Sequence, residues 1–142
     1  MVVSCKRAAR VFSLVLAILL CLGILSTVAS AEGSAYISNY VTNMAAGSSG
    51  KVTVWYQITG TEQMDEIGAI KIVIYENGTQ VKTYKYTDTA GMMSYNIGIH
   101  GGGITYSGIV GKTYYAHVTY QAGKDGGWDN RSVDTNTVTA KN

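Results

Sequence analysis

Several stretches of this chain alternate polar and apolar residues with a period of two, and this period is the feature that most restricts its fold. In residues 51–60, every second residue belongs to one apolar or aromatic set: Val52, Val54, Tyr56 and Ile58. Because successive side chains of a β-strand point to opposite sides of a sheet, this set is expected to face the core, with Tyr56 as a structural core residue. Residues 113–122 alternate in the same way and predict another strand.

A β-hairpin is expected over residues 69–87. Ile70, Ile72 and Ile74 take alternate positions before Asn77-Gly78, a pair that tolerates the positive φ angles of a type I′ turn. The other expected strands are residues 35–42, 94–101 and 134–141. The chain has no proline, 17 glycines and 11 tyrosines, and it lacks runs of helix-forming residues. We therefore predict an all-β domain, a single two-sheet sandwich of about seven strands.

The segments between these strands are interpreted as loops, mainly residues 61–68, 101–112 and 123–132. The second of them includes most of His100-Gly101-Gly102-Gly103, which matches the HGGG motif that supplies an oxyanion hole in lipases. The chain has no Gly-x-Ser-x-Gly motif for the nucleophile, and it lacks the alternating strands and helices of that fold. We interpret the run as a glycine connector that crosses between sheets.

The first 31 residues are typical of a secretory signal peptide. Lys6, Arg7 and Arg10 precede an uncharged apolar run over residues 11–25, which is short for a membrane span of about 20 residues. Small residues follow at the positions that a signal peptidase reads, so cleavage is expected between Ala31 and Glu32. The alternative is that the segment is retained as an anchor.

Removal of this segment changes the charge and the cysteine content. Of 142 residues 111 remain, enough for one domain over residues 32–142. Eight of the eleven basic residues remain against nine acidic ones, so the net charge falls from +2 to −1. Both cysteines, Cys5 and Cys21, are lost, and no disulfide is expected. The charge balance argues against nucleic acid as a partner.

The last third of the chain resembles a fibronectin type III or related immunoglobulin-like domain. The resemblance rests on Gly111-Lys112-Thr113-Tyr114, on the alternating strand that follows, and on the Thr- and Val-rich end at 132–140. It implies a two-sheet immunoglobulin-like sandwich in which Tyr114 is a tyrosine-corner residue, with its hydroxyl bonded to the backbone a few residues upstream. The whole chain also resembles small exported proteins of Gram-positive bacteria, which implies no particular activity.

Acidic residues give two alternatives for chemistry. Asp125, Asp129, Asn130 and Asp134 cluster in and beside one loop and form a weak candidate for calcium, although their spacing fits no EF-hand. Glu62, Asp65 and Glu66 could serve as paired carboxylates in a small glycan hydrolase. The alternative for both groups is that they belong to solvated loops and form no site. No catalytic residue and no cofactor is assigned.

The aromatic residues are the stronger candidates for a binding surface. Alternation places Tyr75, Tyr115 and His117 on the side of their strands that faces away from the core, with Tyr84 or Tyr86 able to join them. Trp128, in a Gly-rich segment, is a further candidate anchor. The alternative is that these tyrosines only stabilise cross-strand pairs on a solvated sheet.

We therefore expect a secreted, extracellular, non-catalytic module that binds or adheres to a protein or a glycan. No membrane contact is expected after signal cleavage. The alternatives are a small secreted glycan hydrolase that uses loop carboxylates, and a structural protein that self-associates through strand edges.

Overall fold

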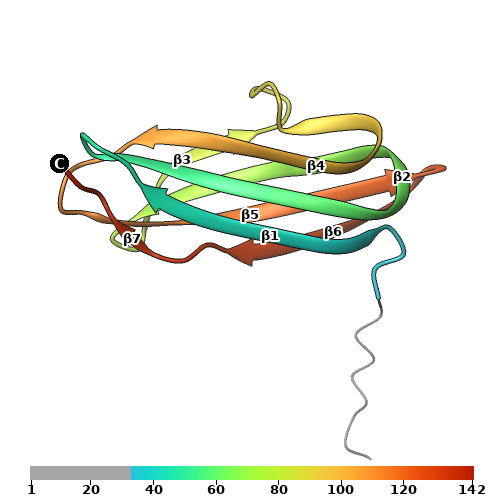
Figure 1. Ribbon diagram of the computed structural model, residues 1–142, viewed down its shortest axis with the longest axis horizontal. Coiled ribbons are helices and arrows are strands. Elements are labelled where there is room, and N and C mark those ends of the chain that lie inside the picture. Colours follow the sequence, from blue (N-terminus) through green and yellow to red (C-terminus); the bar gives the residue numbers. More distant parts are fainter. Residues whose placement is uncertain (1–32) are drawn as a thin grey trace, which may run out of the picture. The chain divides into compact units, whose positions relative to one another are not determined.

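The computed structural model describes residues 33–142 (Figure 1). The expected signal peptide, with its cleavage point between Ala31 and Glu32, lies outside the described residues. The described part is all-β, and its seven strands pair antiparallel in one sheet, which confirms the predicted class. The strands are β1 (Ile37–Ala46), β2 (Lys51–Glu76), β3 (Thr79–Lys85), β4 (Met93–Ser107), β5 (Thr113–Lys124), β6 (Gly127–Asp134) and β7 (Val138–Thr139). Residues 33–142 contain no helix long and apolar enough to span a membrane.

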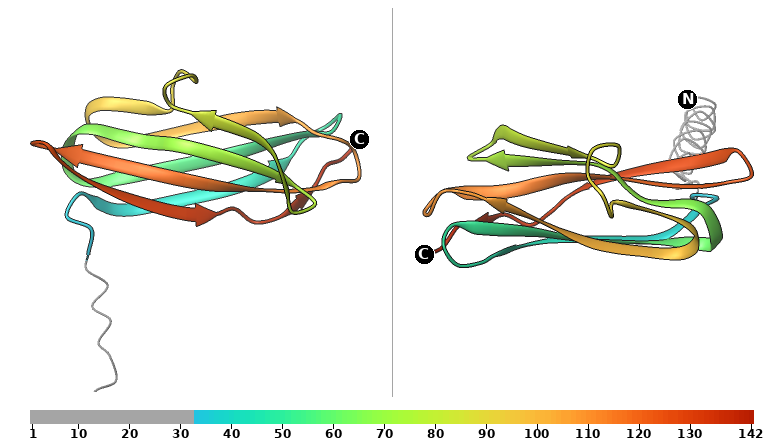
Figure 2. Two further views of the ribbon diagram at one scale, coloured as in Figure 1. Left: turned by 180° about the vertical axis from the view of Figure 1, so that it is seen from behind. Right: turned by 90° about the horizontal axis from the view of Figure 1, so that it is seen from above.

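The long strand β2 organises the sheet. Its first part, residues 51–59, pairs with β1 on one side and with residues 99–107 of β4 on the other. We call these segments the front arm. Residues 66–76 of β2 pair with β5, which pairs with β6, and their other side is taken by the start of β4 and then by β3. These segments form the rear arm. The single sheet curls, so its two arms face each other (Figure 2, right).

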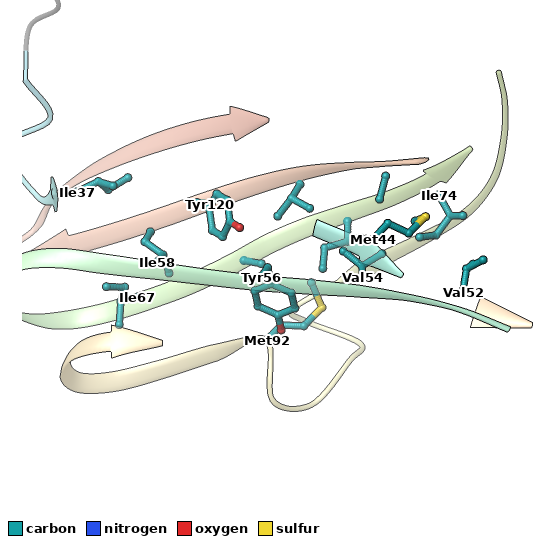
Figure 3. Close-up of a cluster of buried hydrophobic side chains, with 14 of the residues drawn as sticks. Ile37, Met44, Val52, Val54, Tyr56, Ile58, Ile67, Ile74, Met92 and Tyr120 are labelled. Carbon is teal, nitrogen blue, oxygen red and sulfur yellow. The ribbon is translucent and has the colours of Figure 1, made fainter. Parts of the chain in front are cut away.

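The core fills the space between the arms (Figure 3). The side chains predicted to face inward from residues 51–60 and 113–122 are buried: Val52, Val54, Tyr56, Ile58, Tyr114, Ala116, Val118 and Tyr120. Strands β1 and β5 are not hydrogen-bonded neighbours, yet the rings of Tyr40 and Tyr120 lie 5.6 Å apart. The Tyr120 hydroxyl donates to the Val41 carbonyl at 2.7 Å. Burial raises the pKa of Tyr120 to about 12.

The prediction of a loop at residues 61–68 is wrong. Strand β2 continues through this segment, and Met64 and Ile67 are fully buried. A register shift between Thr59 and Met64 marks the place where β2 passes from the front arm to the rear arm. The sequence of this segment is typical of a loop because the irregularity interrupts the period of two and leaves acidic residues as its main feature. The hairpin turn at Asn77-Gly78 is confirmed, since both residues have positive φ.

The prediction of a glycine connector at residues 101–112 is wrong for residues 101–107, which belong to β4, whereas residues 108–112 do connect β4 to β5. His100-Gly101-Gly102-Gly103 lies inside β4 and pairs with β2, and none of its glycines has a positive φ. These glycines serve close packing on both sides of the strand. A Cβ atom on Gly102 would lie 2.5 Å from the Tyr56 hydroxyl, and one on Gly103 would lie 2.7 Å from the Trp55 ring. One aromatic ring therefore covers the glycine backbone on each side.

Two further boundaries differ from the prediction. Residues 123–132 are the end of β5, a tight turn at Asp125-Gly126 and most of β6. Both turn residues have positive φ, as a two-residue hairpin turn requires. Of the closing strand expected at 134–141, only Val138–Thr139 form a separate strand, β7, and Asp134 is the last residue of β6. Ile70 was expected in phase with Ile72 and Ile74, but a register shift at this residue displaces it from their row.

We expect His100 to make the stability of the fold depend on acid. Its side chain is 7% exposed, and its Nδ1 atom lies 2.8 Å from the Ser94 hydroxyl, while Nε2 has no hydrogen-bond partner among the described residues. Burial lowers the pKa of His100 from its ordinary value of 6.5. The unfolded chain therefore binds a proton more readily than the folded protein in weak acid, and the folded state loses stability as the pH falls below about 6.5.

We expect this loss to disappear in His100→Gln, which keeps a polar side chain but does not titrate. The measurement is the urea midpoint between pH 7.5 and pH 5 for the wild type and His100→Gln, with Tyr86→Ala as a control that leaves both histidines in place. The wild type and Tyr86→Ala are expected to share the same decrease in acid. An equal decrease in His100→Gln would show that another group is responsible.

Candidate functional site

The structure brings Tyr75, Tyr115 and His117 together on the outer side of the rear arm. This side of the sheet faces the viewer in Figure 2, left. Tyr75 and Tyr115 are direct cross-strand neighbours, with ring centroids 4.7 Å apart and planes within 4° of parallel. The His117 Nδ1 atom lies 2.6 Å from an Asp134 carboxylate oxygen. Each tyrosine gives one ring face to its neighbour, so the pair offers a partner its outer faces, edges and hydroxyls. We call these three residues the tyrosine patch.

The other tyrosines considered for this patch lie elsewhere. Tyr84 pairs with Ile72 and packs against the core, so it points to the inner side of the rear arm. Tyr86 is exposed but follows the end of β3.

Trp128 is on β6, not in a loop, and it lies on the same outer side as the tyrosine patch. Its cross-strand neighbour on β5 is Gly123. Gly123 is eight residues beyond Tyr115, a distance of about 27 Å along the strand at the usual rise of about 3.4 Å per residue. A ligand that contacts both Trp128 and the tyrosine patch must therefore be extended.

The residue that sequence reasoning missed is Tyr95. The register places Tyr95, Glu66, Gly123 and Trp128 in one row across four strand segments. Tyr95 is 62% exposed and Trp128 60%, the highest values among the large hydrophobic side chains of the described residues. Together with the turn glycines they line a hollow of ≈ 330 Å³, which also contains Asp65, Glu66 and Lys124. We call it the acidic hollow.

The charges around the acidic hollow are predominantly negative. Lys124 Nζ lies 2.6 Å from a Glu62 carboxylate oxygen, and this interaction raises the pKa of Lys124. The Asp65 carboxylate accepts from the Asp125 N–H at 2.8 Å, and Gln121 Nε2 donates to Glu66 at 2.5 Å. This region contains four carboxylates and one ammonium group, that of Lys124. The carboxylates are those of Glu62, Asp65, Glu66 and Asp125. This end of the sheet therefore carries about three excess negative charges, a field that attracts cations.

The three carboxylates considered for glycan hydrolysis are thus on β2, and each accepts a hydrogen bond or forms an ion pair with another group of the chain. The four residues considered for calcium are spread over the turn and both sides of β6. Asp129 accepts from the Ser34 hydroxyl at 2.5 Å, whereas Asp134 contacts His117. Among residues 33–142, no three His, Cys, Asp or Glu side chains are grouped to hold a metal ion.

Tyr114 and Tyr56 lie in the core. Tyr114 is fully buried; its hydroxyl accepts from the Ile109 N–H at 2.8 Å and donates to the Glu76 carboxylate. The Glu76 contact has no counterpart in the resemblance described above. Burial raises the pKa of both tyrosines.

Comparison of the chain with protein-family models, with curated proteins and with solved structures yields no match. None of the three therefore supports the fibronectin type III or immunoglobulin-like family specifically. The all-β class with one curled antiparallel sheet stands on the structure itself.

Proposed function

We propose that this chain is a secreted, extracellular, non-catalytic binding or adhesion module that recognises a protein partner through the acidic hollow. The observation that carries the proposal is the row Tyr95–Glu66–Gly123–Trp128, in which the two most exposed aromatic side chains stand on either side of a carboxylate. Exposed aromatic residues dominate the binding energy of many interfaces, and a hollow between two of them can receive one side chain of a partner.

The chemistry of the hollow favours a basic side chain. A Lys or Arg head group can approach the Trp128 and Tyr95 rings, which attract cations, and it can pair with Glu66 or Asp65. The excess negative charge also attracts a basic segment over a distance of about 10 Å at moderate salt. A glycan would use the aromatic rings but would gain nothing from this charge.

The tyrosine patch is the second contact region in this proposal. It lies on the same outer side, with β5 running from one region to the other. Tyrosine is a common residue of binding surfaces because it offers a large contact area with few rotatable bonds. An extended basic segment along β5 would therefore contact Trp128 at one end and Tyr115 at the other.

We also propose that the two arms correspond to the two sheets of an immunoglobulin-like, fibronectin-III-like sandwich, joined through β2. Two features support this assignment: the packing of β1 against β5 through Tyr40 and Tyr120, and the bond between the Tyr114 hydroxyl and the Ile109 N–H. In such a sandwich the outer side of one sheet is free to bind, as the rear arm is here.

The test measures binding of synthetic peptides rich in Lys and Arg, by calorimetry or fluorescence anisotropy. Tyr95→Ala and Trp128→Ala are each expected to weaken binding about 30-fold, the effect of losing one interface anchor. Raising the salt concentration should weaken the wild type as well, since the hollow binds through charge. Tyr86→Ala, which removes an exposed tyrosine outside the hollow, is the matched control and should bind as the wild type does.

Acidic and neutral peptides and a glycan array are measured alongside. Equal affinity for acidic and basic peptides, or binding to glycans alone through the same two residues, would contradict recognition of a basic protein segment. Hydrolysis of a bound glycan, lost in Glu66→Gln, would favour the glycan hydrolase instead.

A further inference from the structure

A second hollow lies on the outer side of the front arm. This side of the sheet faces the viewer in Figure 1, opposite to the outer side of the rear arm. Its volume is ≈ 520 Å³, and it shares no residue with the acidic hollow. The lining comes from β1, β2 and β4: Val41, Asn43, Trp55, Tyr56, Gln57 and Gly101–Gly103. We call it the Trp55 trough. No sequence motif pointed to it, because Trp55 lies out of phase with the apolar set Val52, Val54, Tyr56 and Ile58.

The glycine run explains why this hollow exists. The Trp55 ring covers Gly103, where a Cβ atom would lie 2.7 Å from the indole, so any other residue would displace the ring. Gly101, on the same side, has no side chain to fill the space beside Gln57. Trp55 is still 56% exposed, as is Val41 at 55%. The indole is therefore both supported from below and open to solvent, which reduces the entropy lost when a ligand contacts it.

The lining of the trough has no acidic or basic side chain. Asn43 is the direct cross-strand neighbour of Trp55, and Gln57 lies two positions further along β2. The two amides each offer hydrogen-bond donors and an acceptor next to the ring. Along the same outer side, Thr53 and Thr105 bond to each other at 2.9 Å, and the first charged residue is Lys51 at the start of β2. The surface therefore combines one flat ring and the Val41 side chain with uncharged polar groups.

We infer that the Trp55 trough is a binding site for a neutral glycan. The C–H face of a sugar ring is apolar and can stack on the indole, while its hydroxyl groups both donate and accept hydrogen bonds, as the amides of Asn43 and Gln57 do. A ligand without charge matches a lining without charge. A basic segment, which the acidic hollow suits, finds no carboxylate in the trough.

A second copy of the chain fits this surface less well. A stable dimer buries about 800 Å² on each partner and needs a mainly apolar centre. The trough offers Trp55 and Val41 as its large exposed apolar side chains, which stand among amides and glycines, and Ile99 is the next exposed apolar side chain on this side of β4. The inference does not depend on the proposed protein partner, because the two hollows lie on opposite sides and can be removed separately.

The test uses the full chain and three sets of oligosaccharides: neutral β-linked glucose, neutral β-linked N-acetylglucosamine and acidic uronic-acid chains. Binding is followed by tryptophan fluorescence and calorimetry. We expect a neutral set to bind, with little dependence on salt, and Trp55→Ala to reduce the affinity about 30-fold. Trp128→Ala is the matched control, since it removes a tryptophan of similar exposure from the other side, and it should leave the affinity unchanged.

Two further variants distinguish loss of the ring from loss of the fold. Trp55→Phe keeps an aromatic ring and should restore part of the affinity, and Gln57→Ala should weaken binding with an unchanged urea midpoint. Absence of binding to both neutral sets at millimolar concentration would overturn the inference. It would equally be overturned by preference for the acidic set, by loss of binding in Trp128→Ala rather than Trp55→Ala, or by a wild-type dimer that Trp55→Ala dissociates. Loss of glycan binding in Trp128→Ala would also place a glycan at the acidic hollow; the other results do not bear on the basic-peptide experiment.

Discussion

Replacement of Gly68 by alanine is expected to destabilise the protein by about 3 kcal/mol, the upper part of the usual range for overpacking. Gly68 lies in β2 beneath the start of β4. A Cβ atom there would overlap the Met92 carbonyl oxygen and lie 2.8 Å from Met93 Cα. These are backbone atoms, so no side chain can rotate away. The turn before β4 would have to move, although Met92 is buried in the core and its carbonyl accepts from the Ala69 N–H at 2.9 Å.

Gly101→Ala is the matched control for this prediction. A Cβ atom on Gly101 has its nearest neighbour, the Tyr56 carbonyl oxygen, at 3.5 Å, which is ordinary van der Waals contact. Its effect should stay within about 0.5 kcal/mol. Urea unfolding followed by circular dichroism measures both variants, with equal slopes showing that the midpoints report stability. Equal midpoints for the two variants would mean that β4 does not approach β2 as closely as the structure has it.

The period of two was sufficient to predict which side of residues 51–60 and 113–122 is buried, but not which side of β4, where the alternating row Tyr95, Ile97 and Ile99 is exposed. Val52, Val54 and Ile58 are fully buried, and Trp55, out of phase with them, points to solvent. The same period puts Tyr115 and His117 on one side of β5 without any knowledge of the neighbouring strands. These features depend only on the geometry of one strand, so they can be read from one segment of sequence.

Features that depend on how strands align could not be predicted in this way. Residues 61–68 were assigned to a loop because the path of β2 from one arm to the other interrupts the period, and that path depends on pairing with β4 and β5. The acidic hollow exists because Tyr95, Glu66 and Trp128 fall in one row, which requires the registers of three strand pairs. A register slip of one residue would turn Tyr95 to the other side of the sheet.

The Asp125-Gly126 pair was a usable hairpin signal that the interpretation as a polar loop overlooked.

Replacement of Tyr114 by alanine is expected to have the largest effect on stability, about 3–5 kcal/mol, as for other buried aromatic rings. The ring is fully buried beside Tyr106, with centroids 5.9 Å apart. Its hydroxyl links two segments, because it accepts from the Ile109 N–H at 2.8 Å and donates to the Glu76 carboxylate. The cost therefore combines a cavity with the loss of two hydrogen bonds, and it is a large part of the roughly 5–15 kcal/mol that stabilises a typical domain.

Tyr114→Phe separates the two contributions, since it keeps the ring and removes only the hydroxyl. We expect it to cost about 2 kcal/mol, because the Ile109 N–H and the Glu76 carboxylate each lose a partner. Tyr115→Phe removes a hydroxyl from the adjacent, half-buried residue and is the control; its urea midpoint should match the wild type. Glu76→Gln keeps an acceptor for the Tyr114 hydroxyl and should cost less than Tyr114→Phe. If Tyr114→Phe and Tyr115→Phe unfold at the same urea concentration, the Tyr114 hydroxyl does not fix the segment that leads into β5, and the comparison with a tyrosine corner loses its physical basis.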